Sequence, residues 1–406
     1  MTQTYPRFAG DTAGPFIRDL ARALVRGGDQ VSVLTPHARC VPARWCDDGV
    51  LVRSFRYAPV TLERVGYSRS LDADERIKGS AALSAPLYAL GARRALRRWL
   101  RAEPHDLVHA HWVVPNALIA ASVRSGLPLV VGLHGSDVFL AEKPPVRPLV
   151  RWALARASGL TGCSPELVER VCALGFDPQR ADVIPYGVDS AVFSPDRQRR
   201  GIWRQRLGIP EAAPVVVSVG RMATKKGYQV LFAGLDSLFA RCPELHLVLA
   251  GAGDRLEVFR AQSAPWGGRV HLPGAVLRDT LPDMYRAADI FVLPAVHDPK
   301  GNVDGLPNVI LEAMASGLPV VSTAISGIPL AITDATHGRL VAEGDTDALI
   351  EALVALVEAP EQARLLGRAG RAKARQALSW DAVASRYRQV YERALEIGVR
   401  RSSVGR

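Results

Sequence analysis

The sequence predicts an α/β fold of two domains, each built on a parallel β-sheet that helices cover on both faces. Short β-branched runs alternate with helical patterns along nearly the whole chain, and the loops between them end in Gly, Ser or Asp. Such alternation is typical of parallel sheets in which a helix follows each strand. The chain has 406 residues, more than a single hydrophobic core usually supports, so two domains are expected.

The first domain is expected over residues 1–190. Its candidate strands are short apolar runs: Val31–Leu34, Leu107–His111, Leu129–Leu133, Gly159–Cys163 and Asp182–Pro185. Its helices are predicted over Gly14–Arg26, Asn116–Ser125 and Pro165–Leu174. The polar stretch S-P-D-R-Q-R-R-G, which contains a proline, marks the boundary to the next domain.

The second domain is expected over residues 191–378. Five further apolar runs predict its strands: Val215–Val219, His246–Ala250, Val270–Leu272, Ile290–Pro294 and Pro319–Ser322. Helices are predicted between them, over Tyr228–Arg241, Leu281–Ala287 and Leu306–Ala315. Residues 379–406 are expected to form a last helix, because Ser379 is a good N-cap before a helical pattern.

The bulk composition is that of an ordinary globular protein. Apolar residues make up 48% and charged residues 22% of the chain. No apolar run approaches the ~18–20 residues of a membrane span, and the N-terminus lacks a signal-peptide core. The cysteines are scattered, odd in number and without C-x-x-C spacing: Cys40, Cys46, Cys163, Cys172 and Cys242. We therefore expect reduced thiols in a cytosolic protein, without a disulfide framework or a zinc site.

The net charge of +11 raises the question of an anionic partner. No basic run is interleaved with aromatic residues, so nucleic acid is not the expected partner. The segment 88–103, Y-A-L-G-A-R-R-A-L-R-R-W-L-R-A-E, is a basic amphipathic helix pattern, with Leu90, Leu96, Trp99 and Leu100 at helical spacing. Such a helix can lie on anionic lipid, or it can pack on its own sheet with a solvated basic face. Both interpretations stay open.

The most informative stretch is residues 304–327, D-G-L-P-N-V-I-L-E-A-M-A-S-G-L-P-V-V-S-T-A-I-S-G. Asp304 precedes a predicted helix N-terminus, and Glu312 lies one to two turns inside that helix. Free backbone N–H groups at a helix start favour a phosphate, and a carboxylate nearby can accept ribose hydroxyls. The pattern predicts a site for a sugar nucleotide. The same sequence is also compatible with an ordinary loop-to-helix junction in which both acids are solvated.

This stretch closely resembles the E-x7-E region of retaining glycosyltransferases with the GT-B fold, particularly glycosyltransferase family four. The resemblance implies two Rossmann-like domains with a cleft between them and a C-terminal helix that crosses back to the first domain. It also implies that Glu312 holds the ribose, that Asp304 faces the transferred sugar, and that Asn308 and Val309 lie near the diphosphate.

Two further segments of the second domain match this family. In V-S-V-G-R-M-A-T-K-K-G, Gly220 and Arg221 follow a predicted strand and Lys226 precedes a helix. Arg and Lys at that place would neutralise a departing diphosphate, and Lys225 is an extra neighbour. The turn with Gly251 and Gly253 resembles the G-x-G turn of the family near the nucleotide base, a pattern that is weak alone. Tyr285 and Met284 are interpreted as helix packing.

In the first domain, G-L-H-G-S-D-V places His134 after a predicted strand. The resemblance implies that His134 contacts the transferred sugar or its phosphate, with Asp137 nearby on the acceptor side. Gly10, Asp11 and Gly14 form a flexible turn ahead of a helix, where backbone could approach phosphate or acceptor. His111 is interpreted as lining the acceptor site. It shares a strand face with His109, but a third metal ligand is missing from this pattern.

Two departures from the family pattern stand out. Only Met1–Thr4 precede the segment Y-P-R-F-A-G, where relatives have a hydrophobic strand. Either the start codon is placed too far downstream or the domain lacks its central first strand. A missing central strand would leave its neighbours unpaired, so a truncated start is favoured. The first acid of the pair is Asp304, where relatives carry glutamate. A loop shift is then needed to bring the shorter carboxylate into place.

The resemblance covers nearly the whole chain, from about Tyr5 to Leu395. It implies transfer of a sugar from a nucleotide sugar to a hydroxyl of a saccharide or lipid-linked acceptor, with retention, in polysaccharide or glycolipid assembly. No cofactor and no metal are expected, because Arg221, Lys226 and helix-end amides would take the place of a cation. A sugar-nucleotide epimerase of the same fold and a non-catalytic nucleotide-sugar scaffold remain alternatives. The expected location is cytoplasmic, with a peripheral position at the inner membrane face left open.

Overall fold

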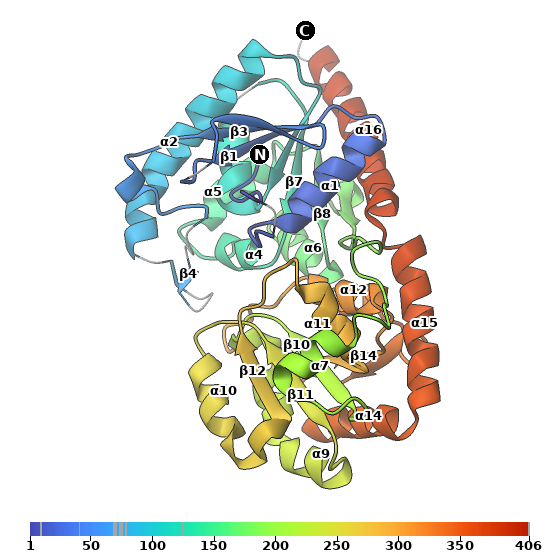
Figure 1. Cartoon of the computed structure of the whole chain (residues 1–406). Coiled ribbons are helices and arrows are strands. Elements are labelled where there is room, and N and C mark those ends of the chain that lie inside the picture. The colour runs from blue at the N-terminus through green and yellow to red at the C-terminus, as the bar shows by residue number, and fades with distance from the viewer. Residues whose placement is uncertain are drawn as a thin grey trace. The chain divides into compact units, whose positions relative to one another are not determined.

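The structure is a computed structural model, and it describes residues 1–404 except 9, 40, 68–70, 73–75, 78 and 124. The chain divides into two compact units: unit 1 comprises Met1–Pro185 with Trp380–Arg406, and unit 2 comprises Tyr186–Ser379. The division falls a few residues before the boundary expected from the sequence. The last helix, α16 (Trp380–Val404), packs within unit 1 against helix α1 (Pro15–Arg26) and the neighbouring strands (Figure 1).

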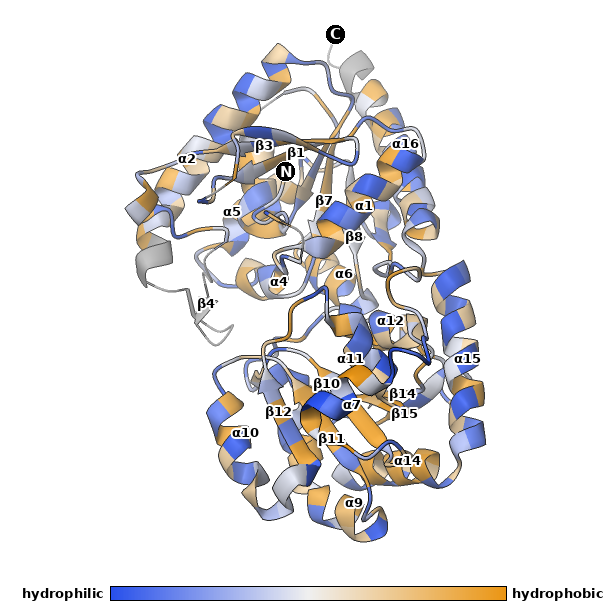
Figure 2. Ribbon diagram, in the orientation of Figure 1, coloured by the Kyte–Doolittle hydropathy of each residue, from blue (hydrophilic) through white to orange (hydrophobic). Residues whose placement is uncertain are grey.

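Unit 2 contains one parallel sheet in the strand order β12-β11-β10-β13-β14-β15. Strands β10, β13 and β14 are buried along their whole length, which explains their uninterrupted apolar sequences (Figure 2). The strands are β10 (Val215–Val219), β11 (His246–Ala250), β12 (Val270–Gly274), β13 (Ile290–Leu293), β14 (Val320–Thr323) and β15 (Gly338–Val341). Only β15, short and half-buried, was not predicted.

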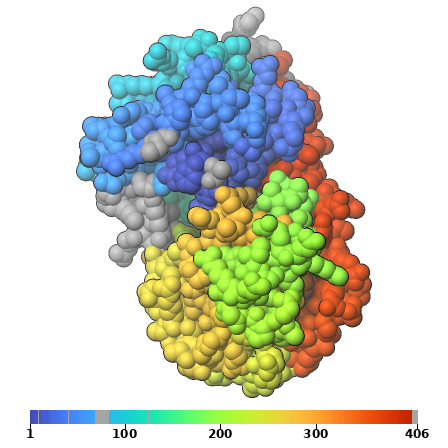
Figure 3. Space-filling model, in the orientation of Figure 1, coloured from blue at the N-terminus to red at the C-terminus, as the bar shows by residue number. Residues whose placement is uncertain are grey.

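Nine α-helices of unit 2 are found in the described residues. The single helix predicted over 228–241 is broken at Gly234, where an added Cβ would lie 2.4 Å from the Ile350 side chain. The segment around α7, drawn in green, lies at the surface of unit 2 in Figure 3. The helices are α7 (Gly201–Leu207), α8 (Tyr228–Ala233), α9 (Leu235–Arg241), α10 (Leu256–Ser263), α11 (Leu281–Ala287), α12 (Asn308–Ala315), α13 (Ile328–Ala331), α14 (Thr346–Glu358) and α15 (Pro360–Gln376).

Unit 1 contains a four-stranded parallel sheet, β6-β7-β8-β9, and a three-stranded sheet, β1-β3-β2. The β2–β3 hairpin was not predicted, although its turn residues Asp48 and Gly49 both have positive φ, as a tight hairpin turn requires. A further two-stranded ladder joins β4 and β5. The strands are β1 (Ser32–Pro36), β2 (Arg44–Asp47), β3 (Val50–Phe55), β4 (Leu71–Asp72), β5 (Arg76–Ile77), β6 (Val108–His111), β7 (Leu129–Leu133), β8 (Gly159–Gly162) and β9 (Ala181–Val183).

The first two residues join the two larger sheets of unit 1. The Met1 amine donates to the His109 carbonyl and the His111 N–H donates to the Met1 carbonyl, at 2.7 and 3.0 Å. On the other side, the Thr2 N–H donates to the Leu34 carbonyl at 3.0 Å. The expectation that the neighbours of a missing first strand would be unpaired is therefore wrong at this end, because Met1 and Thr2 occupy that position.

The remaining helices of unit 1 cover its sheets: α2 (Gly79–Ala102), α3 (Leu118–Val123), α4 (Ser136–Ala141), α5 (Arg147–Leu154) and α6 (Pro165–Cys172). Short helical turns lie at Val60–Leu62, Val113–Ala117 and Pro178–Arg180. Helix α2 contains the predicted basic segment and begins earlier than it. Leu96 and Trp99 of α2 are buried, whereas Leu90 is 44% exposed.

Cys46, Cys163, Cys172 and Cys242 are free thiols, and Cys40 lies outside the described residues. None of the helices in the described part of the chain combines the length and apolarity that a bilayer crossing requires.

Candidate functional site

The centre of the unit 2 sheet is where a ligand site is expected. Strand order reverses between β10 and β13, and in doubly wound sheets ligands bind outside the carboxyl ends of the strands at such a point. The loops that follow these two strands are pressed together there. A Cβ on Gly227 would lie 1.6 Å from the Pro294 carbonyl oxygen, so glycine, with φ of +71°, is required.

These two loops bring two lysines onto one carboxylate. Lys225 Nζ lies 2.8 Å from Asp304 Oδ1, and Lys226 Nζ lies 2.6 Å from Asp304 Oδ2. The lysines belong to a 3-10 turn, Thr224–Lys226, between β10 and α8, and Asp304 lies in the loop after β13. The side chains are 6%, 12% and 20% exposed, respectively, so the cluster is largely withdrawn from water.

The charge state of this cluster follows from its composition. Burial by itself raises the pKa of Asp304, but the positive charges and hydrogen bonds of Lys225 and Lys226 outweigh burial and hold that pKa far below its usual range. Asp304 is therefore ionised at any physiological pH. Two lysines around one carboxylate carry a net positive charge, which suits a diphosphate.

The predicted glycines shape the backbone beside this cluster. Gly220 follows β10, and its N–H donates to the Ala250 carbonyl at 2.9 Å. A Cβ on Gly251 would lie 1.8 Å from the Gly220 carbonyl oxygen, and one on Gly253 would lie 2.5 Å from the Met222 carbonyl oxygen. Both glycines thus allow close packing of two loops at the carboxyl ends of β10 and β11. Arg221 follows directly and is half-buried.

Helix α12 places the other predicted donor residues. It begins at Asn308, so Asn308 and Val309 form its first turn, where N–H groups lack partners within the helix. Glu312, one turn further on, is 5% exposed. Its Oε2 accepts a hydrogen bond from the Tyr285 hydroxyl at 2.9 Å, and its Oε1 lies 3.3 Å from an Arg278 guanidinium nitrogen. The interpretation of Tyr285 as packing alone is therefore incomplete.

In unit 1, Asp137 holds the loop that carries His134. Its Oδ1 accepts the backbone N–H groups of His134 and Gly135, at 3.1 and 3.0 Å, and its Oδ2 accepts that of Val113 at 2.8 Å. The side chain is 2% exposed. Backbone donors therefore occupy the buried carboxylate of Asp137, and its place on the acceptor side stays a prediction.

His134 lies in an aromatic cage. Its ring centroid is 4.9 Å from those of Phe16 and Trp112, and its Nε2 is 3.1 Å from His111 Nδ1. Burial lowers the pKa of His134 to about 3, so the imidazole is neutral at physiological pH. The His111 pKa is also lowered, first by burial and then by neighbouring histidines. His111 is 7% exposed and is a partner of His134, and its place in the acceptor lining stays a prediction.

The turn before α1 contains the three remaining predicted residues. Gly10 and Gly14 have φ of +82° and +70°. Asp11 is 5% exposed and pairs with Arg7, whose Nε lies 2.7 Å from its Oδ2. Asp11 also accepts the backbone N–H groups of Arg7 and Ala13. The Asp11 carboxylate thus fixes the turn, and the approach of this backbone to phosphate or acceptor stays a prediction.

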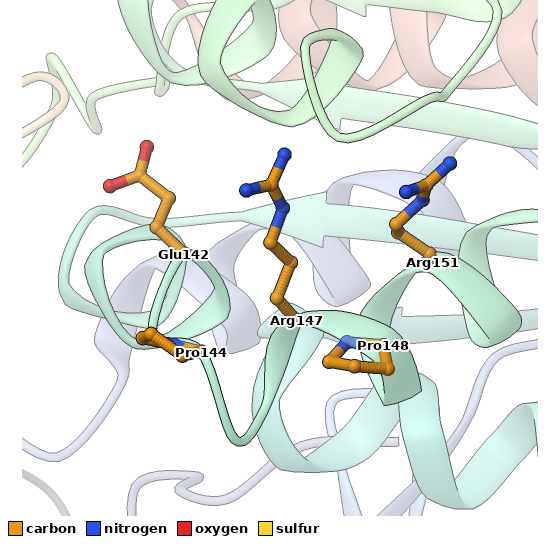
Figure 4. A pocket seen from close by; sticks show the side chains of 5 residues that line it. All are labelled: Glu142, Pro144, Arg147, Pro148 and Arg151. Atoms are coloured by element: carbon orange, nitrogen blue, oxygen red, sulfur yellow. The ribbon is translucent and has the colours of Figure 1, made fainter.

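A cavity of about 660 Å³ lies in unit 1 between the end of α4 and α5. Figure 4 shows the side chains of Glu142, Arg147 and Arg151 pointing to the same side. Glu142 is neutralised by Arg170, whose Nε and Nη2 lie 2.8 and 2.7 Å from its two oxygens. The sequence reasoning missed this pair of arginines, although their spacing of four residues on a helix is a signal for adjacent charges.

Among the residues that the structure describes, no group of three or more His, Cys, Asp or Glu side chains could hold a metal ion. His109 and His111 lie near each other with ring centroids 4.1 Å apart, and His109 Nδ1 is 2.9 Å from the Tyr391 hydroxyl of α16.

Comparisons with known proteins agree with this architecture. Residues 213–359 match the family model for glycosyl transferases group 1, and residues 13–192 match that for glycosyltransferase family 4. A GDP-mannose-dependent alpha-(1-6)-phosphatidylinositol monomannoside mannosyltransferase of Mycolicibacterium smegmatis is 32% identical over 247 residues, or 60% of this chain and 64% of that protein. A D-inositol 3-phosphate glycosyltransferase of Streptomyces griseus is 30% identical over 76% of this chain and 71% of that protein.

Solved structures show the same fold. A sucrose-phosphate synthase from Thermosynechococcus elongatus superposes with a TM-score of 0.76 over 95% of both chains at 21% identity. The matched family models cover both units of the chain, and the fold is that of GT-B glycosyltransferases. This chain therefore belongs to the glycosyl transferases of group 1, in glycosyltransferase family four, and is a glycosyltransferase.

Proposed function

We propose that this glycosyltransferase moves a sugar with retention of configuration from a nucleotide sugar, bound by unit 2, to a hydroxyl of a phosphate-bearing polyol acceptor. The observation that carries the donor part is the cluster of Lys225, Lys226 and Asp304 at the point where strand order reverses in the unit 2 sheet. The cluster combines a positive charge for a diphosphate with a carboxylate for sugar hydroxyls.

The donor is held at its diphosphate and at its ribose in this proposal. Lys226, Arg221 and the first N–H groups of α12, at Asn308 and Val309, bind the diphosphate. Glu312 accepts the ribose hydroxyls. Gly220, Gly251 and Gly253 keep side chains out of the space beside them. Relatives support GDP as one base to test, because the mycobacterial mannosyltransferase is named for its dependence on GDP-mannose.

No metal ion is needed in this proposal. Negative charge grows on the diphosphate as the glycosidic bond breaks, and Lys225, Lys226 and Arg221 supply three cations to stabilise it. We therefore expect the enzyme to transfer sugar in the presence of a chelator.

In the reaction, a bond forms between the acceptor oxygen and the anomeric carbon while the bond from that carbon to the diphosphate breaks. We propose that the proton of the acceptor hydroxyl passes to the departing diphosphate, which stays on the reacting face of the sugar. Asp304 orients the sugar hydroxyls in this proposal.

The acceptor is argued from unit 1 and from the relatives. Arg147 and Arg151 lie together in the cavity beside α5, and two guanidinium groups favour a phosphate. The names of the two relatives refer to a phosphatidylinositol mannoside and to inositol 3-phosphate, each a polyol that bears a phosphate. A free or lipid-linked phosphate ester of a polyol is therefore the acceptor class that we propose.

A peripheral place on the cytoplasmic membrane face is proposed from α2. Leu83, Leu87 and Leu90 are 76%, 41% and 44% exposed. Arg94, Arg97, Arg98 and Arg101 follow on the same helix and are exposed, with no ion-pair partner within the described residues. An apolar stripe that continues into a basic one favours anionic lipid headgroups.

Product analysis tests the reaction. The purified protein is incubated with EDTA, a GDP- or UDP-sugar and an inositol phosphate, and the anomeric configuration of the product is read by proton NMR. A product with the configuration of the donor supports the proposal, and an inverted product would contradict it. Interconversion of donor sugars without acceptor would indicate an epimerase, and binding without any turnover would indicate a scaffold.

A further inference from the structure

The carboxylate of Glu312 is held at both of its oxygens. The Tyr285 hydroxyl donates to Oε2 at 2.9 Å, and an Arg278 guanidinium nitrogen lies 3.3 Å from Oε1. Both donors come from one stretch of chain: Arg278 lies in the loop after β12, and Tyr285 lies on α11, which follows that loop. A carboxylate accepts about four hydrogen bonds, and donors at both of its oxygens fix the orientation of the Glu312 group.

We propose that Tyr285 is a positioning residue that aims Glu312 at the ribose hydroxyls of the donor, with Arg278 bracing the second oxygen. This inference rests on the proposed function, in which Glu312 accepts those hydroxyls. It adds the residues that set the geometry of that recognition and so determine the preference for a ribonucleotide.

The packing around Tyr285 fixes the position of its hydroxyl. The side chain is fully buried, and its ring meets those of Phe193 and Phe291 at centroid distances of 5.8 and 5.9 Å. Phe291 belongs to β13, the central strand next to β10, so the sheet itself sets the place of the ring. The Arg278 guanidinium lies 5.7 Å from the Phe193 ring centroid, which restrains the second donor.

A preformed acceptor costs less to order when the ligand binds than a mobile side chain does. Burial and the neighbouring Glu312 carboxylate raise the pKa of Tyr285 well above its ordinary value. The phenol therefore keeps its proton at every pH of interest and can donate it to Glu312 at 2.9 Å, the nearer of its two acceptors; the other is the Val309 carbonyl at 3.4 Å.

The test compares Tyr285→Phe with the unaltered protein by isothermal titration, using GDP and 2′,3′-dideoxy-GDP, or the UDP pair if UDP binds. The substitution removes one oxygen and keeps the ring. For the unaltered protein, we expect the loss of both ribose hydroxyls to weaken binding about 100-fold, on the scale of hydrogen bonds to a charged group. For Tyr285→Phe, GDP should bind about 10-fold more weakly, and dideoxy-GDP should change by less than about twofold.

Two further variants separate positioning from a general loss of structure. In a Glu312→Gln background, Tyr285→Phe should have little additional effect on GDP binding, because both changes act through one carboxylate. Tyr57→Phe is the matched control: Tyr57 is a buried tyrosine of unit 1 whose hydroxyl donates to the Val65 carbonyl at 2.9 Å. It should leave both affinities unchanged. With a working acceptor, Tyr285→Phe should raise the donor KM more than it lowers kcat.

Equal weakening of GDP and dideoxy-GDP by Tyr285→Phe would overturn the inference, because it would show a structural role. Additive effects of the Tyr285 and Glu312 changes would overturn it as well. If GDP binds but the unaltered protein does not discriminate against dideoxy-GDP, the ribose role of Glu312 and this inference fail while donor binding stands. If no nucleoside diphosphate binds to the folded protein, the proposed function fails too.

Discussion

Lys225 Nζ lies 2.8 Å from Asp304 Oδ1, in a cluster that Lys226 completes from the other side. Asp304 stands where the resemblance to the family implies a glutamate. One ammonium group lies beside each of its two carboxylate oxygens. The three side chains carry one net positive charge at a protein site that is largely shielded from water, which is the basis of the first two predictions.

Lys225 is expected to contribute to diphosphate binding. The change Lys225→Gln removes one of two buried cations and should weaken the binding of a nucleoside diphosphate by about 10- to 100-fold, the range for hydrogen bonds to charged groups. Lys300→Gln is the matched control, because Lys300 is an exposed lysine of the loop that carries Asp304. Isothermal titration measures both. Unchanged affinity in Lys225→Gln would show that this lysine serves only Asp304.

Asp304 is expected to matter for stability and for turnover in different ways. In Asp304→Asn, two ammonium groups are left without their counter-charge, and removing one partner of a buried ion pair costs about 3–5 kcal/mol. The variant should therefore unfold at a lower urea concentration, and a bound nucleoside diphosphate should recover part of that loss. Turnover should fall at least about 100-fold, and Asp304→Glu should retain it. If Asp304→Asn were as stable as the parent protein, Asp304 would not form a buried ion pair with Lys225 and Lys226.

The lowered pKa of His134 predicts acid sensitivity. Burial lowers the pKa of His134 to about 3, from 6.5. Below pH 6.5 the unfolded chain binds a proton that the folded chain excludes, so stability is fully present above about pH 6.5 and is lost as the pH falls toward 3. His134→Asn should reduce the slope of unfolding free energy between pH 6 and 4 by up to about 1.4 kcal/mol per pH unit. Urea titrations at several pH values measure this slope, and parallel curves would contradict the buried neutral state.

Helix α2 is expected to bind anionic lipid. The triple change Arg94→Glu, Arg97→Glu and Arg98→Glu should abolish cosedimentation with phosphatidylglycerol vesicles, since each basic residue near such a surface contributes about 1 kcal/mol. Leu87→Glu should weaken it through the apolar part of the stripe. Arg368→Glu with Arg375→Glu on α15 is the control, because both arginines are exposed on a basic helix of unit 2. Equal binding by the α2 and α15 variants would point to non-specific attraction.

Much of the fold could be predicted because buried parallel strands have a simple sequence signal. Strands β7, β10 and β11 have the predicted bounds, and helix α11 does as well. Elements whose ends or existence depend on tertiary contacts could not be predicted. The break between α8 and α9 at Gly234 depends on the close approach of Ile350, and strand β15 is only partly buried.

The candidate site was only partly visible in the sequence. The positions of Lys226, Asp304 and Glu312 follow from motifs, but a motif does not reveal that Lys225 also reaches Asp304. Nor does it reveal that Tyr285 reaches Glu312 from another helix, because contacts across elements have no local signal. The loop-holding contacts of Asp137 were also not visible, because a carboxylate which holds a loop and one which holds a ligand look alike in a sequence.

The most direct test of the account is titration of the full chain with GDP, UDP and ADP in the presence of EDTA. The account predicts that at least one of them binds without metal and that Arg221→Ala and Lys226→Ala each weaken this binding at least about 10-fold while the protein stays folded. Failure of all three nucleotides to bind a folded sample, or equal binding by both variants, would contradict a donor site at the centre of the unit 2 sheet.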